Sequence, residues 1–148
     1  MNGLKHAESF RDLLVYQKAR DLQQEIFLIS QAFPRDEKFS LTDQIRRSSR
    51  SIGANLAEAW AKRRYQAHFV SKLTDADGEQ YETQHWVDTA VECGYLDIER
   101  GTELIEKCKQ VGRLLGGMIE KAELFCGKPN KVLREQGIEY EIHPSDAN

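Results

Sequence analysis

The sequence has little of what interrupts or cross-links a chain: among its 148 residues, only three are proline and three are cysteine. The prolines stand at positions 34, 129 and 144, outside every long stretch with helical periodicity, so none of them breaks a helix. Cys93, Cys108 and Cys126 are odd in number, and no two have the spacing of metal ligands. We therefore expect reduced thiols rather than a disulfide framework or a zinc site.

Long apolar runs are also missing. None has the 18 or so residues of a membrane-spanning helix, and the opening MNGLKHAESF has no apolar core of a signal peptide. No P-loop, nucleotide-binding glycine pattern or nucleophile elbow occurs. We expect a cytoplasmic protein that makes no membrane contact, catalyses no reaction and binds no cofactor.

What is present is helical periodicity, in a chain that is 40% apolar and 30% charged. We predict four helices, at about 10–33, 40–62, 66–93 and 97–125. Ser9, Ser40 and Asp97 are the predicted N-caps, Pro34 ends the first helix, and Gly94 caps the end of the third. Long helices with short connections favour an all-α, antiparallel up-down-up-down four-helix bundle. The bundle is expected to span residues 10–127, between an N-terminal extension (1–9) and a flexible C-terminal tail (128–148).

Glycines fall inside two predicted helices. Gly78 lies in the middle of the third, where glycine costs about 1 kcal/mol relative to alanine. It is either tolerated there or allows another helix to approach closely, and we favour close approach. Gly116 and Gly117 in the fourth helix lack the strand and the Lys-Ser/Thr of a phosphate loop, so close packing or a local kink is the better interpretation.

The most informative stretch is residues 44–58, QIRRSSRSIGANLAE. At helical spacing, Leu41, Ile45, Ile52 and Leu56 form a narrow arc that should face the core. A polar stripe runs beside this arc and consists of Gln44, Arg47, Ser51, Asn55 and Glu58. The stripe is either the solvated edge of a helix or a half-buried polar network that joins helices or holds a ligand. In the second case Arg47 needs a carboxylate partner, such as Glu82 or Glu58.

Basic residues are concentrated in the same region. The candidates for phosphate contact are Arg46, Arg50, Lys62, Arg63 and Arg64. Residues 75–106 are strongly acidic, so for the sequence alone a solvated face, or salt bridges to the third helix, is the favoured interpretation of the same basic residues. Such an asymmetry can steer an anionic partner or make one subunit complementary to the next. The net charge of −3 gives no overall sign of nucleic-acid affinity.

Four-helix bundles can hold a di-metal site. Such sites need a Glu-x-x-His motif on each of two helices. Glu82 and His85 form one such motif and the second copy is missing, so His85 is assigned to the bundle or its surface. We expect no metal.

Many scattered positions together resemble a known pattern, from about residue 10 to 125. Near the start it includes Phe33-Pro34, Glu37, Phe39, Leu41, Gln44, Arg47, Ser51-Ile52, Asn55 and Ala57-Glu58. It continues with Phe69, Ala76, Gly78, Glu82 and Gly94-Tyr95-Leu96. These residues resemble a four-helix-bundle family first named for proteins encoded in intervening sequences of bacterial 23S rRNA genes. The family is similar to the accessory variability determinant of diversity-generating retroelements. Two positions depart from the pattern: Ala59 replaces a usual glycine, and Glu79 replaces a usual serine.

The resemblance implies a cytoplasmic protein without a known enzymatic reaction, assembled into a homo-oligomeric ring that is typically a pentamer. For the retroelement relatives it also implies RNA or DNA binding through basic surface residues. On this basis Arg46, Arg50, Lys62, Arg63 and Arg64 are assigned to phosphate contact. Gln44, Arg47, Ser51, Asn55, Glu58 and Glu82 are assigned to a structural polar network. The alternative is a structural or protein-interaction module that has no nucleic-acid role.

Overall fold

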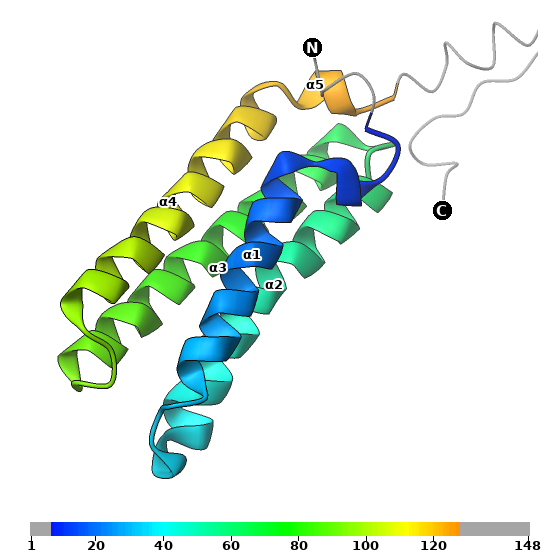
Figure 1. Ribbon diagram of the computed structural model, residues 1–148. Coiled ribbons are helices and arrows are strands. Elements are labelled where there is room, and N and C mark those ends of the chain that lie inside the picture. Colours follow the sequence, from blue (N-terminus) through cyan, green and yellow to red (C-terminus); the bar gives the residue numbers. More distant parts are fainter. Residues whose placement is uncertain (1–6, 128–148) are drawn as a thin grey trace, which may run out of the picture.

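The chain folds as an all-helical protein in the computed structural model, which describes residues 7–127. Its four main helices are α1 (Leu14–Ser30), α2 (Asp43–Ala61), α3 (Gln66–Glu92) and α4 (Ile98–Glu120), and a short α5 (Ala122–Phe125) follows. No strand occurs within the described residues. The long helices lie side by side in an elongated body (Figure 1). The all-α prediction is confirmed, whereas the predicted flexible tail at 128–148 lies outside the described residues.

Two helix ends follow from local chemistry that the sequence already shows. The Asp97 carboxylate accepts a hydrogen bond from the Arg100 amide, at 2.7 Å, and so caps the start of α4. Gly94 ends the turn after α3 with φ at +79°, a conformation that glycine adopts without strain. Both predictions are confirmed.

The starts of α1 and α2 differ from the predictions. Ser9 caps a separate 3₁₀ turn (Phe10–Asp12), and the Asp12 carboxylate accepts a hydrogen bond from the Ser9 amide. Leu13 is extended (φ −70°, ψ 131°), so α1 begins only at Leu14. Before α2 the chain forms a π-helical turn (Lys38–Thr42) that runs directly into the helix. Ser40 lies inside this turn and is not the N-cap, because the helical backbone already starts before it.

The predicted close approach at Gly78 is wrong. A Cβ built on Gly78 meets nothing within 4 Å, and the same holds for Gly116 and Gly117. Close approach occurs instead at two glycines of α4. A Cβ on Gly101 would lie 2.5 Å from Val91 Cγ2, and one on Gly112 would lie 2.8 Å from Gln80 Nε2.

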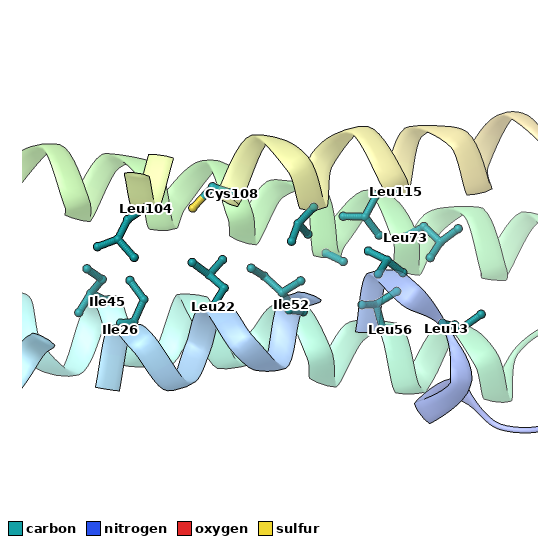
Figure 2. Packing of buried hydrophobic residues seen from close by; sticks show 14 of the residues in the cluster. Leu13, Leu22, Ile26, Ile45, Ile52, Leu56, Leu73, Leu104, Cys108 and Leu115 are labelled. Carbon is teal, nitrogen blue, oxygen red and sulfur yellow. The ribbon is translucent and has the colours of Figure 1, made fainter. Parts of the chain in front are cut away.

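The core runs along the inside of all four long helices (Figure 2). The predicted arc on α2 is confirmed, since Leu41, Ile45, Ile52 and Leu56 are at most 1% exposed. Leu22 and Ile26 of α1 and Leu104 and Leu115 of α4 are fully buried around them. Within residues 7–127, no helix combines the length and hydropathy needed to cross a membrane.

The connections at one end of the bundle contact each other. The Tyr95 hydroxyl, between α3 and α4, donates a 2.7 Å hydrogen bond to Glu37 Oε2, in the 3₁₀ turn Arg35–Glu37 between α1 and α2. The rings of Phe33 and Tyr95 pack beside it, with centroids 5.9 Å apart. The bond to a carboxylate raises the pKa of Tyr95 to about 12, since ionisation would lose the bond and place two anions together.

Candidate functional site

The polar stripe of α2 faces the seam with α3. Arg47 Nη2 lies 2.9 Å from Glu82 Oε2, and the same oxygen accepts a 3.0 Å hydrogen bond from Trp86 Nε1. The Arg47 side chain is 56% exposed, so the pair is solvated rather than buried. Exposed ion pairs contribute about 0.2–1 kcal/mol each, so this pair adds little to the stability of the fold.

The other members of the stripe make separate contacts. Gln44 Nε2 donates to the Phe39 carbonyl at 3.4 Å, and Asn55 Nδ2 donates to the Ser51 carbonyl at 2.9 Å. Among the six residues assigned to a network, only Arg47 and Glu82 are thus joined by their side chains.

Glu58 reaches across the seam to Lys72, at 2.9 Å. This bond lowers the pKa of the Glu58 carboxyl and raises the pKa of the Lys72 ammonium. Lys72 was not among the predicted site residues, although it is a basic residue on the next helix and can pair with Glu58.

A buried hydroxyl pair holds the same seam from the inside. Ser48 Oγ and Thr83 Oγ1 lie 2.9 Å apart and both residues are fully buried. Either hydroxyl can be the donor in this pair, since Thr83 Oγ1 also lies 2.9 Å from the Glu79 carbonyl and Ser48 Oγ lies 3.3 Å from the Ile45 carbonyl. Neither residue was among the predicted site residues. The available signal was the spacing, because Ser48 stands three residues after Ile45, on the core arc.

The Glu79 carboxyl group is only partly satisfied by its surroundings. Its Oε1 is buried and has no hydrogen-bond partner among the described residues. Burial raises the pKa of the Glu79 carboxyl, neighbouring Glu82 raises it further, and Arg47 opposes the shift. A carboxylate at this position therefore costs stability at neutral pH.

The five candidate phosphate-binding residues fall into two groups. Arg46 and Arg50 lie on α2 beside α1, where both guanidinium groups sit over the Phe27 ring, at 4.9 and 5.6 Å from its centroid. Within residues 7–127, neither of these arginines forms an ion pair with a carboxylate. Their charge is therefore available to an anionic partner.

The second group lies in the connection between α2 and α3. At 1.5 Å per residue, Lys62 is about 18 Å from Arg50 along the helix axis. Lys62 and Arg64 are exposed there. Arg63 is held back: its guanidinium lies 3.6 Å from the Trp60 ring centroid and donates to the Trp60 carbonyl at 2.9 Å. These two contacts make Arg63 the least available of the five to bind phosphate, and partial burial lowers the pKa of its guanidinium group.

A shallow hollow of about 420 Å³ opens on the outer face of α2. Its lining brings together residues of both predicted sets, namely Asp43, Arg46, Arg47, Arg50, Ser51 and Ala54. Three arginines and one acid give it a net positive charge, which suits an anion.

Metal ligands are not gathered anywhere in the described part of the chain: no three His, Cys, Asp or Glu side chains could share an ion there. In the single Glu-x-x-His motif, Glu82 is engaged by Arg47 and Trp86, and the His85 ring packs edge-on against Trp86 with centroids 4.7 Å apart.

Similarity to known proteins was found at two levels. The family described as 23S rRNA-intervening sequence protein matches residues 11–117. A crystal structure of a protein of unknown function from the S23 ribosomal protein family of Bacteroides thetaiotaomicron VPI-5482 has a similar fold, with a TM-score of 0.66 and 28% sequence identity. The similarity covers 72% of this chain and 96% of that one. No curated protein matches the sequence.

Proposed function

Because this chain belongs to the 23S rRNA-intervening sequence protein family, we propose that it is a non-catalytic, homo-oligomeric protein that binds RNA or DNA through the basic side of α2. The observation that carries the proposal is the pair Arg46 and Arg50, two neighbouring guanidinium groups that no carboxylate neutralises within residues 7–127. Unpaired arginines attract phosphate and release its condensed counterions on binding. The resemblance to the retroelement determinant favours a nucleic acid as the partner.

The proposal takes the four long helices as an antiparallel up-down-up-down bundle within residues 10–127. Contacts along the seams support this direction. Arg47 pairs with Glu82 and Glu58 with Lys72, so contacts move backward along α3 as they move forward along α2. The corresponding pairs between α3 and α4 are Val91 with Gly101 and Gln80 with Gly112.

Oligomerisation belongs to the same proposal, with a ring and five subunits as the form that the family resemblance implies. The charge asymmetry supports it: α2 is rich in arginine, whereas residues 75–106 are acidic, so opposite charges on two copies can face each other. Size-exclusion chromatography with light scattering measures the subunit number, and a monomer at all concentrations would contradict this part. We also place the protein in the cytoplasm, which suits the free thiols of Cys93, Cys108 and Cys126.

Binding to labelled RNA and DNA at two salt concentrations tests the nucleic-acid role. The double substitution Arg46→Ala/Arg50→Ala should weaken binding. It should also flatten the log–log salt dependence, by about 0.7 per lost contact for a single strand or 0.9 for duplex DNA. Lys62→Ala/Arg64→Ala should act in the same direction. The matched control is Arg20→Ala/Arg35→Ala, which removes equal charge from exposed positions outside both groups.

The alternative function is a structural or protein-interaction module whose assembly is itself the functional object. The same charge asymmetry favours it, because complementary surfaces can serve subunit contacts alone. A stable oligomer that binds neither RNA nor DNA at low salt would support this alternative and contradict the nucleic-acid role.

A further inference from the structure

The pair of arginines on α2 is positioned by side chains of α1. Arg46 and Arg50 are four residues apart, so they project from the same face of the helix on successive turns. Both guanidinium groups lie over the single ring of Phe27, at 4.9 and 5.6 Å from its centroid. The negative face of the ring offsets part of the repulsion between the two cations and restricts their motion.

Arg46 is fixed a second time, by a hydrogen bond. Its Nε donates to Ser30 Oγ at 2.8 Å, and Ser30 Oγ in turn donates to the Phe27 carbonyl at 3.0 Å. Ser30 is only 2% exposed, so this chain of bonds is shielded from water. The Nε donor of Arg46 is thus used internally, and its two terminal nitrogens are left for a ligand.

The adjacent arginine gives an internal comparison. Arg47 carries the same charge, but its guanidinium group is paired with Glu82 of α3. The charged residues that share the hollow with Arg46 and Arg50 are Arg47 and Asp43, so the local balance remains positive. Position within the fold, rather than charge alone, distinguishes Arg46 and Arg50.

We propose that Arg46 and Arg50, positioned by Phe27 and Ser30, form a preorganised clip that binds one phosphate of a nucleic-acid backbone through directed, charge-assisted hydrogen bonds. This inference rests on the proposed nucleic-acid binding and makes it specific. Guanidinium groups present a planar set of donors that matches phosphate oxygens, which an ammonium group does not. A clip of this kind depends on geometry, whereas a diffuse basic surface depends only on the number of charges.

Substitutions that preserve the net charge distinguish a clip from a diffuse basic surface. The measurement is the affinity for a labelled single-stranded RNA, by fluorescence anisotropy, in the full-length protein. Arg46→Lys/Arg50→Lys should weaken binding about tenfold, since directed bonds to charged groups are lost. Phe27→Leu keeps the apolar volume and the net charge, and should weaken binding about threefold. Arg20→Lys/Arg35→Lys is the matched control, because it makes the same change at two exposed arginines outside the hollow, and it should bind like the wild type.

A competition experiment reads out the geometry directly. At constant ionic strength, inorganic phosphate should displace RNA from the wild type more effectively than chloride does. Arg46→Lys/Arg50→Lys and Ser30→Ala should lose this preference, which a merely structural role of Ser30 would leave intact. Circular dichroism confirms that each variant is folded.

The outcomes are distinguishable. If the lysine variant and Phe27→Leu bind like the wild type while Arg46→Ala/Arg50→Ala does not, the clip is refuted and the proposed function stands. If the alanine variant also binds like the wild type, or the wild type binds no nucleic acid, both are refuted. Binding of a labelled phosphorylated peptide, with no binding of RNA or DNA, would assign the clip to a protein partner and overturn it as stated.

Discussion

Replacing Gly78 by alanine should stabilise the protein by about 1 kcal/mol. Gly78 is exposed in the middle of α3, and a Cβ added there meets nothing within 4 Å. The substitution therefore costs no packing, while glycine in a helix interior is about 0.8–1.0 kcal/mol less favourable than alanine. For a domain of this size, a gain of 1 kcal/mol corresponds to a rise in melting temperature of roughly 3–5 °C.

The same substitution at Gly101 should have the opposite sign. Gly101 is buried, and its added Cβ would lie 2.5 Å from Val91 Cγ2, on a stiff β-branched side chain. Overpacking of this kind costs typically about 1–3 kcal/mol, which exceeds the gain in helix propensity. Gly101→Ala is therefore the matched control, since the chemical change is identical and only the surroundings differ.

Urea denaturation followed by circular dichroism at two protein concentrations measures both effects, with an unchanged slope as the check on two-state behaviour. The reasoning is refuted if Gly78→Ala destabilises the protein or if both variants shift in the same direction. A loss at Gly78 that appears only at high concentration would show that another subunit packs on this face of α3.

Three further predictions concern single side chains. Ser48→Ala and Thr83→Val each break the buried hydroxyl pair, and a double-mutant cycle should give a coupling free energy of about 1 kcal/mol; strictly additive effects would contradict the pair. Burial raises the pKa of Glu79, so its charged form destabilises the fold at neutral pH; Glu79→Gln should raise the melting temperature at pH 7, with a benefit that fades as the pH falls toward 4.5, and a constant difference would argue against this cause. Of the five tyrosines, Tyr95 should ionise near pH 12 because of its bond to Glu37; the step is measured by ultraviolet absorbance and should disappear in Tyr95→Phe.

The parts of the fold that depend on a few neighbouring residues were predictable. Asp97 accepts a hydrogen bond from a backbone amide within one turn, and Gly94 adopts the positive φ that ends α3. Both roles depend only on neighbouring residues, so they follow from the sequence alone. Ser40 fails as a cap because it lies inside a π-helical turn, which no residue of the turn signals. Gly78 was misassigned because close approach depends on which helix lies opposite, and that requires the tertiary arrangement.

The same distinction holds for the candidate site. Sequence analysis paired Arg47 with either Glu82 or Glu58, and only the register of α2 against α3 selects Glu82. The contact of Arg63 with Trp60 spans three residues and was within reach of helical spacing. Phe27 was not, because it belongs to another helix and meets the arginines only after α1 and α2 pack together.

The bond between Tyr95 and Glu37 has a consequence for the thermodynamics of ligand binding. It ties the connection after α1 to the connection after α3, and Arg46 lies in the first turn of the helix that follows the tied segment. The two connections at this end of the molecule therefore become ordered during folding, and their conformational entropy is lost at that stage. An anion that binds here should meet a surface with little freedom left to lose, so calorimetry should show a small conformational penalty, and amide hydrogen exchange at this end should change little on binding.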